Sequence, residues 1–138
     1  MVVFELGSNA VATEEQVRAM VDLVPSSKTV FLVNVRTPFP LQDINNELFK
    51  KVADDRANVT LIDWHRYSKG HDDWFDGDGT HLKPSGCVKY MEMIEKALIK
   101  HYEQEAAREE GRDEVVLPVP EVPLRSALGP QEEAAPSS

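Results

Sequence analysis

Residues 29–35 read TVFLVNV, a run of apolar and β-branched residues with a single polar position. Such a run is typical of a strand that is buried on both faces, as strands of parallel sheets are. Residues 2–6 (VVFEL) and 59–64 (VTLIDW) have the same character. The sequence therefore predicts three strands, with the central run as the most buried.

Helical patterns separate these strands. Thr13 and Gln16 form a capping box ahead of a helix over about residues 14–24, and a second apolar periodicity covers residues 41 to 54 or 55. A third helix begins at Pro84 and keeps core spacing to about residue 102. Alternating strands and helices predict an α/β fold, with a three-stranded parallel sheet covered by helices on both faces in three αβα layers.

Length and charge restrict the classes of protein to consider. A chain of 138 residues holds one domain at most. The net charge is -9, and residues 103–138 carry nine acidic against three basic side chains. We expect residues 1–102 to form the domain and residues 103–138 to form an acidic, Pro/Glu/Ala-rich tail that is disordered once the last helix frays. No basic stripe indicates nucleic acid, and no export signal or membrane-spanning run occurs.

The long polar loop over residues 65–83 contains an acid–base pair. Asp78 precedes His81 by three residues, and Gly79 between them permits a tight turn. A carboxylate at this spacing can hold an imidazole in one tautomer, as in the Ser-His-Asp triad. The alternative is a solvated loop with an incidental histidine.

The first predicted strand runs into Gly7-Ser8-Asn9. An asparagine amide at this point can donate to a developing oxyanion, and Gly7 lets the backbone approach closely. The alternative is an ordinary turn between a strand and a helix. Because parallel strands present their carboxyl ends at one edge of the sheet, Asn9 and His81 are expected to share one site although about seventy residues separate them.

A metal site is the other chemistry that this loop suggests. Its acidic and imidazole residues are His71, Asp72, Asp73, Asp76, Asp78 and His81. A calcium loop that starts at Asp72 would place Trp74 and Lys83 at ligand positions, and no zinc spacing occurs. We therefore expect no bound metal.

The remaining candidates are structural. Cys87 is expected to pack as a small residue under the third helix, with a reactive thiolate at a helix start as the alternative. Trp64, Trp74 and Phe75 are expected first as core or rim aromatics and second as walls of an acceptor pocket.

Read together, four stretches resemble the SGNH (GDSL-like) hydrolase superfamily, and in particular the extracytoplasmic SGNH domain of membrane acyltransferases of the peptidoglycan O-acetyltransferase type. They are residues 2–9 (VVFELGSN), 30–38 (VFLVNVRTP), 61–64 (LIDW) and 74–86 (WFDGDGTHLKPSG). The resemblance covers about residues 1–102 and implies a flavodoxin-like sheet. It implies Gly7 and Asn9 as the oxyanion-hole block, and Asp78 and His81 as the triad acid and base. It also implies an acyl donor and a carbohydrate acceptor as partners, an N-terminal membrane domain in the intact protein, and no cofactor.

The chain departs from the family pattern at its first block. No G-D-S motif, which carries the nucleophilic serine, occurs in the 138 residues. We therefore expect the C-terminal part of such a domain, truncated to about three strands with three helices and inactive alone. Ser8 is a weaker candidate nucleophile. The alternatives are a non-catalytic remnant or binding protein and, as a weak third, a metal-binding loop protein; the exposed sheet edge favours self-association.

Overall fold

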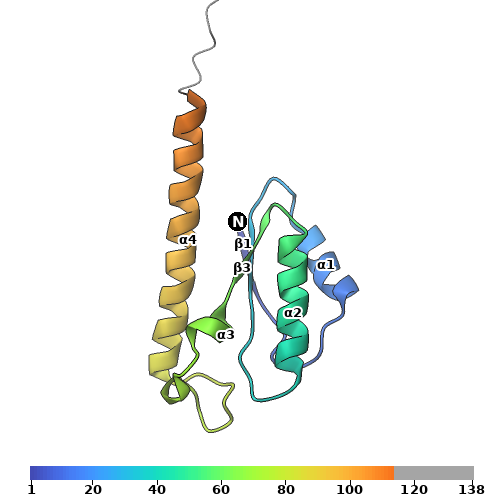
Figure 1. Ribbon diagram of the computed structural model, residues 1–138, viewed down its shortest axis with the longest axis vertical. Helices are drawn as coiled ribbons and strands as arrows, with labels where there is room; N and C mark the ends of the chain where they lie inside the picture. The colour runs from blue at the N-terminus through green and yellow to red at the C-terminus, as the bar shows by residue number, and fades with distance from the viewer. Residues whose placement is uncertain (114–138) are drawn as a thin grey trace, which may run out of the picture.

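The structure, a computed structural model, describes residues 1–113. Its elements in chain order are β1 (Val2–Glu5), α1 (Glu14–Asp22), β2 (Val30–Val33), α2 (Leu41–Asp54), β3 (Val59–Ile62), α3 (Trp64–Tyr67), a 3-10 turn η1 (Asp72–Trp74) and α4 (Pro84–Asp113). The predicted α/β class with a three-stranded parallel sheet in three layers is confirmed. Figure 1 shows α1 and α2 on one side of the sheet and α4 on the other.

The sheet is parallel throughout, in the order β1-β2-β3. Each residue of the central strand β2 is at most 1% exposed. Alternate β2 side chains point to opposite faces. Val30 and Leu32 pack toward α1 and α2, whereas Phe31 and Val33 pack toward α4. The predicted central strand is therefore the core of both layers.

One layer packs α1 and α2 against the sheet. Its buried members are Val17, Val21, Val30, Leu32, Val35, Phe49, Val52 and Val59. The predicted capping box is present, since Thr13 accepts from the backbone of Gln16 and the Gln16 side chain accepts from the backbone of Thr13. This cap fixes where α1 begins.

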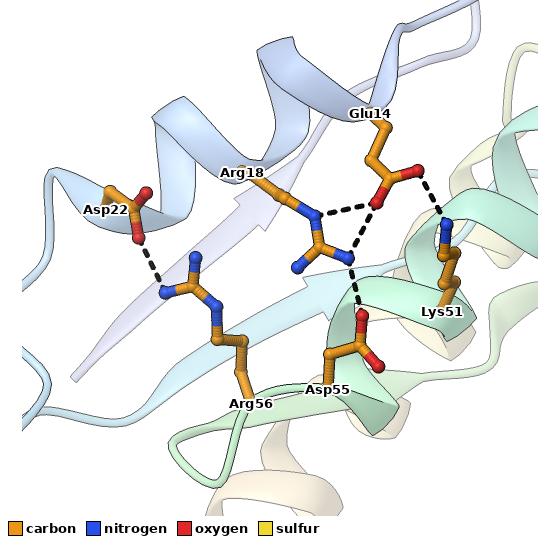
Figure 2. A network of polar contacts seen from close by, with 6 residues as sticks. All are labelled: Glu14, Arg18, Asp22, Lys51, Asp55 and Arg56. Carbon is orange, nitrogen blue, oxygen red and sulfur yellow. Dashed lines mark hydrogen bonds and ion pairs between the residues drawn. The ribbon is translucent and has the colours of Figure 1, made fainter.

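Ion pairs add a second connection between α1 and α2 on the surface (Figure 2). Arg18 bonds Glu14 at 2.7 Å and Asp55 at 2.5 Å. Lys51 reaches the other oxygen of Glu14, and Arg56 pairs with Asp22. The Lys51 and Arg18 bonds lower the pKa of the Glu14 carboxyl. Exposed pairs contribute little singly, so this network mainly sets the position of α1 on α2.

The other layer is rich in aromatic residues. Its buried members are Phe31, Val33, Ile62, Trp64, Phe75, Tyr90 and Met93. Trp64 packs edge-on against Tyr90 and stacks on Trp74, which confirms these aromatics as core or rim residues. Gly86, in the first turn of α4, lies so close to Trp74 that a Cβ atom would stand 2.2 Å from its carbonyl oxygen. Any larger residue would push α4 off this layer.

Several boundaries differ from the predictions. The third strand ends at Ile62 because Asp63 accepts from the backbone of Arg66 and caps α3. This helix begins at Trp64, the last residue of the predicted strand, and continues into the stretch predicted as loop. The last helix continues to Asp113 rather than fading near residue 102. Residues 103–112 (EQEAAREEGR) are mostly strong helix formers, which extend a helix without apolar spacing. The predicted disordered segment beyond this point lies outside the described residues.

The Cys87 prediction is wrong, because this side chain is exposed on α4 rather than packed beneath it. It lies on an apolar surface that also carries Val88, Met91, Ile99 and Tyr102, each at least 50% exposed. The edge of β1 is also unpaired in the described sheet, and Val3 and Leu6 lie exposed there. No helix within residues 1–113 is both long and apolar enough to cross a bilayer.

Gly86→Ala tests the packing of α4. We expect it to lower the free energy of unfolding by about 2–3 kcal/mol, because the new methyl group collides with the Trp74 carbonyl. Gly111→Ala is the matched control in the same helix, since nothing lies within 4 Å of its added Cβ. Urea unfolding followed by tryptophan fluorescence measures both; equal effects would contradict the packing described.

Residues 1–138 expressed alone are expected to self-associate through the free β1 edge and the apolar α4 surface. Light scattering over a range of concentrations should report dimers or larger species. Met91→Lys, which places a charge on the exposed α4 surface, should shift this equilibrium toward the monomer. A concentration-independent monomer with a sharp, high melting transition would contradict the prediction.

Candidate functional site

The loop after β3 folds into a closed turn around the acid–base pair. Phe75 and Leu82 form an antiparallel bridge, and the backbone N–H of Asp76 donates to the His81 carbonyl at 2.8 Å. Gly79 sits inside the turn at a φ of +68°, a conformation that L-residues rarely adopt. The turn therefore holds residues 78 and 81 at fixed positions next to each other.

Asp78 contacts His81 through both carboxylate oxygens. One oxygen accepts from the backbone amides of Thr80 and His81, each at 2.9 Å. The other lies 2.5 Å from Nδ1 of the His81 ring. The bond to the His81 ring, followed by the two backbone bonds, lowers the pKa of the Asp78 carboxyl to about 2. The contact between the carboxylate and the ring also raises the pKa of the His81 imidazole. A neutral His81 that donates Nδ1–H to Asp78 has its Nε2 lone pair free to accept a proton.

The loop after β1 is shaped by its contact with α2. Gly7 has a φ of +100°, and a Cβ atom there would lie 3.0 Å from Phe49 and 3.1 Å from Asn45. The Asn45 amide donates to the Gly7 carbonyl at 2.7 Å. Gly7 thus lets the chain turn tightly against α2 and carries Asn9 to the carboxyl edge of the sheet.

The two loops line one cavity of about 530 Å³. Its residues are Glu5, Leu6, Ser8, Asn9, Asn34, Val35, Arg36, Trp64, Asp76, Thr80, His81, Leu82, Cys87 and Tyr90. The structure therefore brings Asn9 and His81 to a shared cavity, as the parallel topology requires. Gly7 and Asp78 do not line it; each supports a neighbour that does.

The loop after β2 braces this site, and no role was predicted for it. The Arg36 side chain lies 4.1 Å from the centre of the Phe75 ring, donates to the Ser68 carbonyl at 2.5 Å and pairs with Asp72. The Thr37 and Thr80 hydroxyls bond each other at 2.8 Å. Arg36 and Thr37 directly follow the predicted strand of residues 29–35. This position could have indicated a role at the site, because the carboxyl ends of parallel strands lie at the same edge of the sheet.

Asn34 and Tyr90 are two further cavity residues that the sequence did not single out. Asn34 is 5% exposed; it donates to Asp63 at 2.7 Å and accepts from the backbone of His65. The Tyr90 hydroxyl is buried and has no hydrogen-bond partner within residues 1–113. Burial raises the pKa of this hydroxyl, and the Glu5 carboxylate raises it further. Both signals depend on burial, which spacing alone does not reveal.

The acidic loop does not assemble a metal site in the described part of the chain, where no group of three His, Cys, Asp or Glu side chains is placed to hold an ion. Asp72 instead pairs with Arg36, and His71 stacks on Trp74 with ring centres 3.9 Å apart. The Asp78 carboxylate is hydrogen-bonded to the His81 ring. These side chains stabilise the loop.

Curated proteins named as O-acetyltransferases are similar to this chain. The O-acetyltransferase OatA of Staphylococcus aureus (strain NCTC 8325 / PS 47) is 34% identical over 100 residues. The protein named "Putative O-acetyltransferase SACOL0978", from strain COL, is 38% identical over 99 residues. Each match covers 72% of this chain and 16% of the relative. The matches support a relationship to an acyltransferase family.

The chain is related in sequence to O-acetyltransferases, of which it spans about a sixth. No model of a known protein family matches it. Chemically, the cavity offers an imidazole that contacts a carboxylate through Nδ1, and it also offers an amide that can donate to an anion. Both groups suit acyl transfer.

The His81 ring should titrate above the ordinary pKa of histidine, because Asp78 favours its charged form. Asp78→Asn should lower this pKa, since the amide retains a hydrogen-bond partner but removes the negative charge. Ring-proton NMR across pH 4–10 measures both values. An identical His81 titration in wild type and variant would contradict the contact.

Proposed function

We propose that this chain supplies the acid–base pair and the oxyanion-binding amide of a serine-type SGNH acyltransferase or esterase that moves an acetyl-like group. One observation carries the proposal: His81, which Asp78 contacts through Nδ1, and Asn9 line one cavity on the carboxyl edge of the sheet. The similarity to O-acetyltransferases supports the same chemistry.

The reaction divides into two matched steps. A serine outside these residues loses its proton to Nε2 of His81, and its oxygen bonds to the acyl carbonyl carbon. The carbonyl oxygen becomes an anion that accepts a hydrogen bond from the Asn9 amide. The bond to the donor oxygen then breaks, and His81 returns the proton to that oxygen. An acceptor hydroxyl or water repeats the sequence and releases the serine.

The nucleophile would enter beside β1. The unpaired β1 edge and the exposed apolar surface of α4 are suited to cover by preceding strands and a helix of a larger domain. A strand paired with β1 in parallel would end at the same edge as Gly7–Asn9, which places a residue after it at the cavity. Residues 1–113 would then be the C-terminal part of this domain.

The partners of the intact protein follow from this chemistry. The donor is an acetyl-like ester, and the acceptor is a carbohydrate hydroxyl, which we propose belongs to the cell wall. Hydroxyl, amide and charged groups around the cavity suit a polyhydroxyl acceptor. An N-terminal membrane acyltransferase domain would deliver the donor, and the site would face the extracytoplasmic side.

A non-catalytic binding protein is the second candidate, because no G-D-S motif occurs in the 138 residues. It would retain the cavity and the free sheet edge without turnover. The DNA immediately upstream separates the two. A frame encoding G-D-S after a predicted strand supports the enzyme, and its absence there and in neighbouring frames contradicts the split-domain proposal.

Hydrolysis of p-nitrophenyl acetate by the intact protein tests the activity. His81→Ala should lower kcat at least about 10³-fold, and Asn9→Ala about 10²-fold. His71→Ala is the matched control from the same loop and should retain the wild-type rate, because it stacks on Trp74 outside the cavity. The rate should rise with pH through the His81 pKa, since the neutral ring is the base.

Two outcomes of this assay would redirect the proposal. No turnover by the intact protein, or a wild-type rate in His81→Ala, would favour the non-catalytic candidate. Ser8 lines the cavity and is the candidate nucleophile within the described residues. Loss of activity in Ser8→Ala would assign the nucleophile to this position, whereas a retained rate excludes Ser8 and is the result that the proposed serine beside β1 requires.

A further inference from the structure

Asn45 on α2 is a buried polar residue that contacts the loop after β1. Its side chain is 0% exposed. The amide nitrogen donates to the Gly7 carbonyl at 2.7 Å and to the Ala10 carbonyl at 2.8 Å, and the amide oxygen accepts from the Ala12 backbone at 2.9 Å. Three bonds therefore hold a stretch of six residues that includes Asn9.

These bonds use both amide hydrogens of Asn45 and its carbonyl oxygen. Asn45 does not line the cavity, so it has no group to offer a substrate. Removing it would leave two carbonyls and one N–H of the loop without these partners, at a cost for each group that stays buried. The side chain therefore specifies the path of the loop rather than contacting the reacting atoms.

The adjacent residue does the same for the loop after β2. Asn46 accepts from the backbone N–H of Val35 and donates to its carbonyl, both at 2.8 Å. Val35 and Asn9 line the same cavity. Consecutive asparagines on α2 thus hold the loops that follow two neighbouring strands, and Asn45 holds the loop that carries the proposed oxyanion donor.

We propose that Asn45 is a positioning residue that aims the Asn9 amide into the cavity by fixing the loop of residues 7–12. This inference rests on the proposed function, because it assigns Asn45 an effect on rate through Asn9. A merely structural Asn45 would lower stability without a specific effect on Asn9.

Hydrogen–deuterium exchange of the intact protein tests the loop first. Asn45→Leu, which keeps the approximate volume without the amide, should speed exchange at residues 7–12 at least about 10-fold. Asn45→Ala is the second variant if the leucine does not fold. Val52→Ala is the matched control, since Val52 is a fully buried core residue of the same helix. Unchanged exchange over residues 7–12 in both Asn45 variants would overturn the proposal.

A double-mutant cycle on p-nitrophenyl acetate hydrolysis then separates positioning from stability. Asn45→Leu should lower kcat about 10–100-fold with KM little changed, as part of an oxyanion contact is lost. Val52→Ala should keep the wild-type kcat below its melting temperature. Adding Asn45→Leu to Asn9→Ala should cause no further loss, because both changes remove the same contact.

The outcomes distinguish this inference from the proposed function. Multiplicative losses in the cycle, or a kcat for Asn45→Leu equal to that of Val52→Ala, would overturn the positioning role in an active enzyme. If the Asn45 variants exchange faster at residues 7–12 but Asn9→Ala leaves the rate of hydrolysis unchanged, the proposed function is overturned. Asn45 then remains the residue that holds the loop.

Discussion

The arrangement depends on the burial of β2 between two helical layers. A strand covered on both faces by α1, α2 and α4 pairs in parallel with its neighbours, and the chain returns through helices between strands. All three strands consequently end at the same edge. That edge gathers the loops that carry Asn9, Arg36 and His81, and it is the reason that distant parts of the sequence line one cavity.

At this edge, the two proposed functional groups are held in different ways. The Asp78–His81 contact lies within one turn and depends on Gly79 and the closed backbone of that turn. Asn9 is held from outside its loop, by an α2 side chain 38 residues away from Gly7. The proposed base is thus fixed locally, whereas the proposed oxyanion donor depends on the packing of α2 against the loop that follows β1.

Sequence patterns predicted the features that local spacing controls. The strands, the Thr13 capping box and the closeness of Asp78 and His81 follow from short-range rules, and the structure has all of them. Asn45 was not predicted, because its partners are distant in sequence; a polar residue four positions after Leu41 on an apolar helix face was the signal. Cys87 was misassigned because helical spacing does not reveal which apolar face lacks a partner.

We propose that Asn9 and His81 act on one serine ester beside the β1 edge, which is unpaired in the described sheet. The most direct test is a crystal structure of the intact protein after reaction with a fluorophosphonate, which bonds covalently to activated serines. The proposal predicts phosphorus on a serine next to β1, with a phosphoryl oxygen within hydrogen-bond distance of the Asn9 amide and Nε2 of His81 beside the serine oxygen. An adduct that contacts neither side chain would contradict it.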